Sequence, residues 1–184
     1  MSGIVALRPL TLNDTENIVK WRNKPAVRKN LYSQATLTPE QHIRYYHTMV
    51  ETGRVRQFVI VVREDNKVCD IGSVFLKNLD AHSQKAEFGI FIGEDAVRGK
   101  GYGKQAVMRT LDYAFDELRL NRVYLTVMAD NTAAVKAYEK SGFAVEGVMK
   151  EDYLRDGSFV DIIMMGVTRK VWKERNKSNG TDQS

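Results

Sequence analysis

The sequence predicts a single α/β (α+β) domain with a sheet of about seven strands and about four helices, closed by a β-hairpin. Strand-like and helix-like hydrophobic patterns alternate along most of the chain. A glycine-rich turn at residues 98–104 joins a strand to a helix, and Asp156-Gly157 separates two strand-like segments near the C-terminus. The chain has 184 residues, and a domain averages roughly 150, so we expect one domain.

The first segments of the chain predict one strand and two helices. A short strand over residues 4–8 precedes a helix that begins with a capping sequence at Thr11 and ends before Pro25. A second helix begins at Thr38, where a capping-box spacing is followed by proline at the first helical position, and it ends at Gly53. Two helices are therefore expected before the main part of the sheet.

Three strand-like segments follow, at residues 57–63, 69–76 and 86–92. The first two are rich in β-branched and aromatic residues and predict an antiparallel pair. In the third, alternation places Glu87 on the face opposite the aliphatic side chains. Cys69 is the one cysteine, so it has no partner for a disulfide or a metal site, and we expect it in the core.

The second half of the chain predicts a helix after the glycine-rich turn, a strand, a further helix and a closing hairpin. An apolar stripe after the turn is typical of an amphipathic helix that packs on a sheet. Residues 123–128 alternate as a fifth strand, and the next helix begins at Asn131 and ends at Gly142, a residue suited to the left-handed conformation after a helix. The hairpin strands are expected at residues 143–154 and 159–167.

Composition is ordinary for a globular protein, with 43% hydrophobic and 28% charged residues. We expect a folded domain over residues 1–172 and a disordered tail over residues 173–184, which are too polar to join a core. No apolar run approaches the ~20 residues that span a bilayer, and the N-terminal segment lacks the apolar stretch of a signal peptide. We therefore expect no membrane partner and a cytoplasmic location.

The net charge of +5 implies attraction to polyanions, with basic runs at residues 20–29 and 98–104. No nucleic-acid-binding module is recognised, so the sequence predicts no direct nucleic-acid partner. His42 and His47 do not share a helix face in the manner of a zinc pair, and no metal site is predicted.

The turn Arg98-Gly99-Lys100-Gly101-Tyr102-Gly103 predicts a pyrophosphate site. Glycines let successive backbone N–H groups point inward, and the helix N-terminus adds partial positive charge. A P-loop requires Ser or Thr after its Gly-Lys pair, whereas Gln105 follows Lys104 here. A Rossmann fingerprint requires a different glycine spacing and a place near the first strand. Both rival motifs are therefore excluded.

Two segments together resemble the GNAT superfamily of N-acetyltransferases. Arg98, Gly101 and Gly103 match its coenzyme A loop, Gln/Arg-x-x-Gly-x-Gly/Ala, and residues 131–143 are similar to its Asn-x-x-Ala-x-x-x-Tyr-x-x-x-Gly-Phe segment. The resemblance covers nearly the whole chain. It implies the GNAT fold with a mixed central sheet, and transfer of an acetyl group from acetyl-CoA, as cosubstrate, to a primary amine.

The C-terminal pattern of Glu146, Gly147 and Gly157 is most similar to the RimJ/RimL-like branch of that superfamily. This branch includes ribosomal-protein N-terminal acetylases, spermidine acetyltransferases and nucleotide amino-sugar acetyltransferases. Sheet-edge homodimers are common among these relatives, so a homodimer is a further expectation. A non-catalytic acyl-CoA-binding regulatory domain stays open as an alternative of another class.

The resemblance also implies roles for individual residues. Tyr138 would protonate the thiolate leaving group. The structural alternative is that Tyr138 only packs in the core as an aromatic residue of an amphipathic helix. Glu87 would act as the general base, directly or through water. The structural alternative is that Glu87 is a half-exposed strand carboxylate paired with a lysine. Asn131 would contact coenzyme A or simply cap its helix. The full predicted set for coenzyme A is Phe91, Ile92, Gly93, Arg98, Gly99, Lys100, Gly101, Tyr102, Gly103, Lys104 and Asn131.

The acceptor amine is predicted from the basic run at residues 20–29, which would repel a polycation and attract an anionic acceptor. The stretch from Trp21 also resembles flagellin-sugar enzymes that acetylate a UDP-linked 4-amino sugar. In that resemblance Arg22 meets a phosphate and Trp21 stacks on a ring, unless Trp21 is a core residue. His82 precedes the central strand and would touch the acceptor, or is a solvated loop residue. Spermidine and a ribosomal-protein N-terminus are the alternative acceptors, and contact with nucleic acid is expected only through such a ribosomal substrate.

Overall fold

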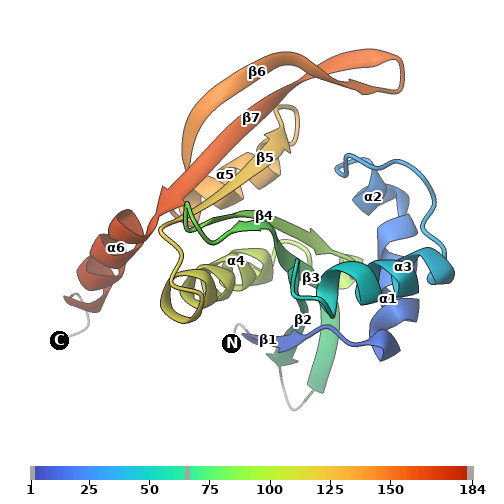
Figure 1. The fold of residues 1–184 in the computed structure, drawn as a ribbon, viewed down its shortest axis with the longest axis horizontal. Coiled ribbons are helices and arrows are strands. Elements are labelled where there is room, and N and C mark those ends of the chain that lie inside the picture. The colour runs from blue at the N-terminus through green and yellow to red at the C-terminus, as the bar shows by residue number, and fades with distance from the viewer. Residues whose placement is uncertain (1–2, 65–66, 182–184) are drawn as a thin grey trace. The chain divides into compact units, whose positions relative to one another are not determined.

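The computed structural model describes residues 3–64 and 67–181. Its strands hydrogen-bond in the order β1-β2-β3-β4-β5-β7-β6. The sheet is mixed, because β4 and β5 pair in parallel while the pairs β1–β2, β2–β3, β5–β7 and β6–β7 are antiparallel. The α/β class is confirmed. Six α-helices lie in the described residues, more than the four expected, because the short α2 and the C-terminal α6 were not predicted (Figure 1).

The chain divides into two compact units, described here in turn: unit 1 is Met1–Leu79 with Phe88–Thr110, and unit 2 is Asp80–Glu87 with Leu111–Ser184. The strands of unit 1 are β1 (Ile4–Pro9), β2 (Arg56–Glu64), β3 (Lys67–Asp80, whose last residue falls in unit 2) and the greater part of β4 (Lys85–Ile92). Its helices are η1 (Leu12–Asp14), α1 (Thr15–Asn23), α2 (Pro25–Arg28), α3 (Pro39–Tyr45), η2 (Tyr46–Val50), η3 (Asp95–Val97) and the first turns of α4 (Tyr102–Asp112).

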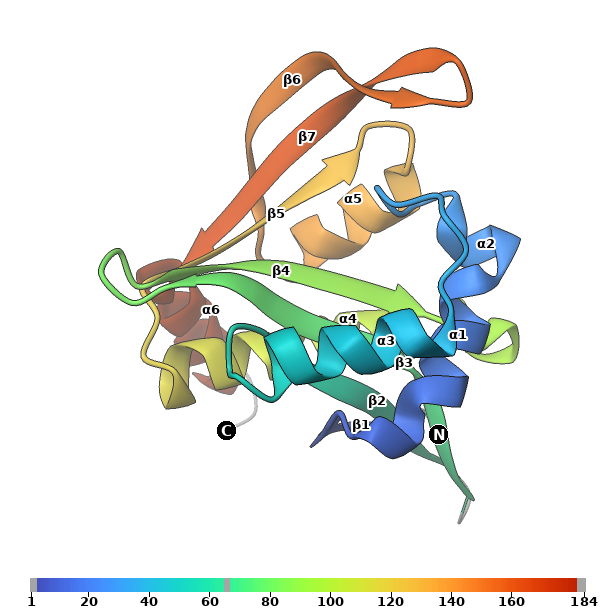
Figure 2. The ribbon, with the colours of Figure 1, turned by 45° about the vertical axis from the view of Figure 1, so that its right-hand side comes forward.

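Local signals in the sequence place the helices of unit 1. Thr38 and Gln41 form a reciprocal capping box at the start of α3, with proline at its first position, as the sequence predicts. Figure 2 shows α3 lying across the strands of unit 1 with α1 beside it. The apolar side of α1 joins β2 and β4 in one buried cluster of Leu10, Ile18, Trp21, Val27, Val59 and Phe91.

Cys69 was predicted in the core, but the structure exposes it. The register of β2 against β3 shifts between Ile60, which pairs with Gly72, and Val61, which pairs with Asp70. This bulge leaves one extra residue in β3, and an extra residue reverses the face on which the residues beyond it lie. Cys69 and its neighbour Val68 are therefore exposed, whereas Ile71 and Val74 further along the strand are buried in the core.

Unit 2 contains β5 (Arg122–Met128), β6 (Ala144–Arg155), β7 (Ser158–Thr168), η4 (Tyr113–Glu117), α5 (Thr132–Lys140) and α6 (Arg169–Thr181). The β6–β7 hairpin turns at Asp156 and Gly157, both with positive φ, which confirms the predicted Asp-Gly turn (Figure 1). Gly142 has φ of 104° directly after α5, where the sequence predicts a left-handed glycine.

Helix α6 stands where a disordered tail was predicted from residue 173 onward, as far as residue 181. Trp172 anchors its first turn: the side chain is 2% exposed, its Nε1 donates to Asp112 Oδ1 at 3.2 Å, and its ring lies 6.3 Å from that of Phe115. The polar residues that follow include Lys, Glu and Arg, which favour helices once a first turn is fixed. Residues 182–184 of the predicted tail lie outside the described residues. None of the described helices has the length and apolar character needed to cross a membrane.

Candidate active site

The glycine-rich turn of unit 1 has the backbone of an anion-binding loop. Gly99 and Gly101 have φ of 79° and 83°, and α4 begins at the next residue, Tyr102. A Cβ added at Gly99, Gly101 or Gly103 would meet nothing within 4 Å. Since the first N–H groups of a helix have no partner within that helix, the turn presents donors to open space at a positive helix end. The predicted loop therefore fits a diphosphate.

The side chains of this turn bind acidic partners of the same unit. Arg98 Nη2 lies 3.0 Å from Asp95 Oδ1, and Lys100 Nζ lies 3.3 Å from Glu64 Oε2. Hydrogen bonds from Lys100 and Tyr102 lower the pKa of Glu64. Tyr102 is buried, and its hydroxyl oxygen accepts from Gly3 N at 3.4 Å, so its side chain is a core anchor rather than a ligand for coenzyme A.

The end of β4 is fixed by two backbone contacts at Gly93. The Gly93 N–H donates to Ile71 O at 2.8 Å, and Gly93 O accepts from Lys24 Nζ at 2.6 Å. The N–H of Gly93 is thus engaged within the protein and is not available as a donor to coenzyme A, for which Gly93 was predicted. The predicted roles of Phe91 and Ile92 stay predictions.

A pocket of about 330 Å³ opens in unit 1 among α1, α3, β2, β3 and β4. We call it the Arg22 pocket. Its apolar lining is Ile18, Leu37, Phe75 and Phe91. Its polar lining is Arg22, His42, Tyr45, Gln57 and Lys77. Such a volume, lined by both apolar and polar side chains, suits a small molecule.

Of the three residues predicted to touch the acceptor, Arg22 alone lines this pocket within the described part of the chain. Trp21 is 1% exposed, its Nε1 donates to Glu94 Oε1 at 2.6 Å, and a Cβ on Gly93 would lie 2.0 Å from its ring. It is a core residue and does not stack on a ligand. His82 is exposed in the turn before β4 and does not line the pocket.

Sequence reasoning missed the other polar residues of the Arg22 pocket. His42 was considered only as a zinc ligand, and Tyr45, Gln57 and Lys77 belong to no motif. They come from three different elements, so no spacing along the chain marks them. Only the packing of α3 on the sheet brings them together.

Burial controls the charge of the groups in the Arg22 pocket. It lowers the pKa of Arg22 and of His42, and it raises the pKa of Tyr45. A neutral imidazole and a neutral phenol therefore stand beside a guanidinium that stays charged in proteins. The Arg22 Cζ lies 6.0 Å from the centre of the Phe91 ring, on the strand that ends at Gly93.

The predicted catalytic residues both belong to unit 2. Glu87 is half-buried on β4 and lies opposite Tyr124 in the parallel register with β5. Tyr138 is half-buried on α5, with its ring 5.9 Å from the centre of the Phe143 ring in an edge arrangement. Asn131 Oδ1 accepts from Ala134 N at 3.3 Å, so its helix-capping role is confirmed. The catalytic roles of Glu87 and Tyr138 stay predictions.

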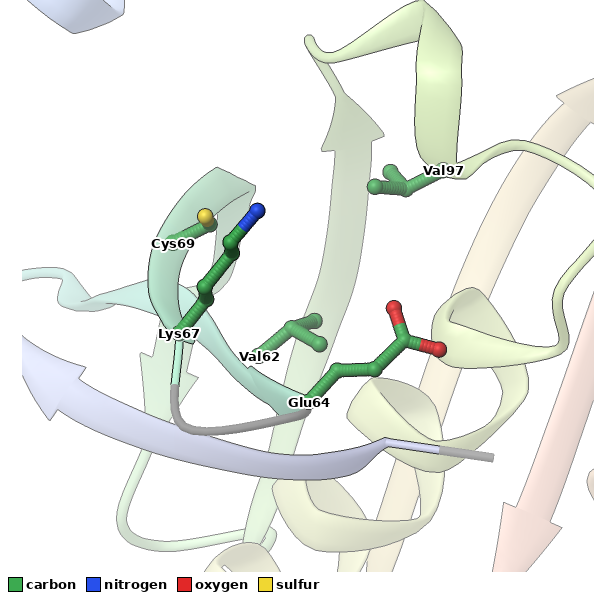
Figure 3. Close-up of a pocket in the computed structure, with 5 residues that line it drawn as sticks. All are labelled: Val62, Glu64, Lys67, Cys69 and Val97. Atoms are coloured by element: carbon green, nitrogen blue, oxygen red, sulfur yellow. The ribbon is translucent and has the colours of Figure 1, made fainter. Parts of the chain in front are cut away.

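A second pocket, of about 220 Å³, lies at the far end of the β2–β3 pair, and Val62, Glu64, Lys67, Cys69 and Val97 line it. Figure 3 shows Lys67 and Cys69 close together on β3 and Val97 across the pocket from them. This pocket borders the glycine-rich turn through Glu64, the partner of Lys100. In residues 3–64 and 67–181, no group of three or more His, Cys, Asp or Glu side chains is arranged to hold a metal ion.

A glycine-rich turn at a helix N-terminus, following the central strand of a mixed sheet, is suited to the diphosphate of a nucleotide-linked cosubstrate, as an acyltransferase that uses acetyl-CoA requires. Residues 5–144 match the family model of the acetyltransferase (GNAT) domain, and the chain belongs to this family. Its activity is N-acetyl transfer with acetyl-CoA as cosubstrate.

The chain is similar along most of its length to characterised N-acetyltransferases. It is 28% identical over 177 residues to spermidine N(1)-acetyltransferase of Vibrio cholerae, covering 96% of this chain and 100% of that protein. It is 28% identical over 165 residues to the L-amino acid N-acetyltransferase of Escherichia coli, covering 90% and 98%. The crystal structure of the Vibrio cholerae enzyme with CoA and spermine superimposes with a TM-score of 0.84 at 27% identity, covering 92% and 98%.

Proposed function

We propose that this protein acetylates the primary amine of a small molecule bound in the Arg22 pocket. The pocket is the observation that supports the proposal most directly. It has the volume of a small-molecule site, and Phe91 of its wall is one of the residues that the GNAT resemblance assigns to coenzyme A. The relatives support a small amine, since one is named for spermidine and another for L-amino acids.

The reaction needs a deprotonated amine, a polarised thioester carbonyl and a proton for the leaving sulfur. The amine nitrogen attacks the carbonyl carbon, the carbon–nitrogen bond forms and the carbon–sulfur bond breaks. In the proposed scheme Glu87, directly or through water, takes the proton from the amine, and the Tyr138 phenol gives a proton to the thiolate. The amides of residues 99–104 hold the diphosphate of coenzyme A at the start of α4.

A polyamine is the second candidate acceptor, because the Vibrio cholerae relative is a spermidine acetyltransferase. The nucleotide-linked amino sugar, which the sequence predicts first, has no support from the relatives described above. Their names favour the polyamine alternative. The cytoplasmic location and the homodimer stay predictions.

Steady-state release of free coenzyme A from acetyl-CoA, measured across a panel of primary amines, tests the proposal. We expect at least one small amine to support turnover, and we expect Tyr138→Phe to lower kcat by about a hundredfold while its ring packing on Phe143 is kept. Tyr113→Phe removes a hydroxyl from a half-buried tyrosine with no assigned role and should leave kcat unchanged. Equal kcat for the wild-type protein and Tyr138→Phe would refute the role of Tyr138.

A further inference from the structure

Positive charge dominates the Arg22 pocket. Arg22 and Lys77 line it, and no Asp or Glu is among its lining residues in the described part of the chain. Asp14 is the acidic group that acts electrostatically on His42, but it is already bound to Arg8 through two hydrogen bonds of 2.9 and 2.6 Å. Asp14 is therefore already paired with Arg8.

Arg22 is a partly buried cation without an ion-pair partner. Its Nε is buried and has no hydrogen-bond partner, and no carboxylate of the described residues lies within ion-pair distance of its guanidinium. A desolvated charge is unfavourable unless an anion and hydrogen bonds compensate it. Guanidinium groups are suited to carboxylate and phosphate because two of their N–H donors match two oxygens.

The neutral groups of the pocket do not supply that anion. The Tyr45 hydroxyl donates to Gln57 Oε1 at 3.1 Å, and Gln57 Nε2 donates to Ser73 Oγ at 3.0 Å. Ser73 in turn donates to the Phe58 carbonyl at 2.8 Å. This chain of hydrogen bonds fixes Tyr45 as a protonated donor, so it cannot neutralise Arg22 as a phenolate.

His42 is also fixed in a neutral form. Thr15 Oγ1 donates its single proton to Leu12 O at 2.7 Å, so at 3.0 Å from His42 Nδ1 it accepts a hydrogen bond from that nitrogen. The remaining ring nitrogen, Nε2, is buried with no partner in the described structure, and burial lowers the pKa of the ring, so Nε2 carries no proton near pH of about 7. His42 therefore adds neither a positive nor a negative charge to the pocket.

We propose that Arg22 is a specificity-determining residue, which selects an amine acceptor that carries a carboxylate or phosphate group and disfavours polycations. This inference rests on the proposed function of the same pocket. An anionic group beside the reacting amine would pair with Arg22, whereas an additional ammonium group of a polyamine would face the like charge of Arg22. The polyamine specificity of relatives is thereby not expected in this chain.

Matched pairs of amines test the proposal, with kcat/KM measured by release of coenzyme A. One arm compares L-amino acids with the amines that lack their carboxylate, and a second compares phosphorylated amino alcohols with the free amino alcohols; spermidine is the polycation. We expect the anionic member of at least one arm to be preferred by about tenfold or more. The arm that responds distinguishes carboxylate from phosphate. Arg22→Gln should reduce the preference to within about threefold.

Arg44→Gln is the matched control, since it removes the same charge from an exposed position on α3 outside the pocket. It should keep the wild-type preference, and calorimetry should give the same coenzyme A affinity for Arg22→Gln as for the wild-type protein. Turnover of neutral amines or spermidine at least as fast as the anionic amines, or an unchanged preference in Arg22→Gln, overturns the inference and leaves the proposed function standing. Absence of turnover with every small amine overturns both.

Discussion

His42 is a buried imidazole whose pKa burial lowers, although the charge of Asp14 acts in the opposite direction. In the unfolded chain a histidine binds a proton below pH of about 6.5. In the folded protein His42 stays neutral to a lower pH, so the unfolded state binds more protons in that window. The contribution of His42 to stability is therefore complete above pH of about 6.5 and decreases as the pH falls.

This pH dependence is measurable by denaturant unfolding between pH 8 and pH 5. We expect the wild-type protein to lose up to about 1.4 kcal/mol of unfolding free energy per pH unit more than His42→Gln does below pH of about 6.5. The two proteins should have parallel curves above that pH. Parallel curves across the whole range would show that the His42 ring is accessible to protons in the folded protein.

At the scale of the element, two glycines where the glycine-rich turn meets α4 have different functions: Gly101 allows a backbone conformation, and Gly103 leaves space for a ligand. Gly101 has φ of 83°, a conformation that costs other residues about 1–2 kcal/mol, so its role is in the backbone of the free protein. Gly103 lies inside the first turn of α4, where no positive φ is required and the position of a Cβ is open. Gly103 therefore contributes to function by leaving the position of a side chain empty, where the diphosphate is proposed to bind.

The two glycines therefore predict opposite effects of alanine. Gly103→Ala should raise the unfolding free energy by about 0.5–1 kcal/mol, because alanine favours a helix, and should weaken acetyl-CoA binding by about tenfold, because its methyl group enters the diphosphate space. Gly101→Ala should lower the unfolding free energy. Thermal denaturation and calorimetry of both variants measure these effects. Unchanged acetyl-CoA affinity in Gly103→Ala would place the diphosphate elsewhere.

Elements that depend on neighbouring residues were predicted well from the sequence. The capping box at Thr38, the cap at Asn131 and the Asp156-Gly157 turn each need only local chemistry, and all three are confirmed. Cys69 was misplaced because the bulge in β3 depends on pairing with β2. Of the residues that line the Arg22 pocket, the sequence predicted Arg22 as an acceptor contact and missed the other polar ones. The lining comes from elements far apart in sequence, and a periodic pattern indicates the faces of only one element at a time.

At the scale of the whole molecule, the unfolding free energy depends on Trp172, which the polar composition of the C-terminal segment gave no reason to place in the core. Trp172 is followed mainly by polar residues, yet it is buried against Phe115 and hydrogen-bonded to Asp112. Trp172→Ala should lower the unfolding free energy by about 3–5 kcal/mol. Val171→Ala, at a neighbouring position that is 48% exposed, should change it by less than about 0.5 kcal/mol. Equal, small effects in denaturant unfolding would mean that α6 is not packed in solution.

Trp21 and Arg22 are neighbours on α1, and successive helical residues point about 100° apart. Trp21 holds the helix against the strand end at Gly93, and Arg22 lines the Arg22 pocket. If Arg22 selects the acceptor as proposed, a substitution at position 22 changes the preferred acceptor and leaves in place the Trp21 contacts that hold the helix.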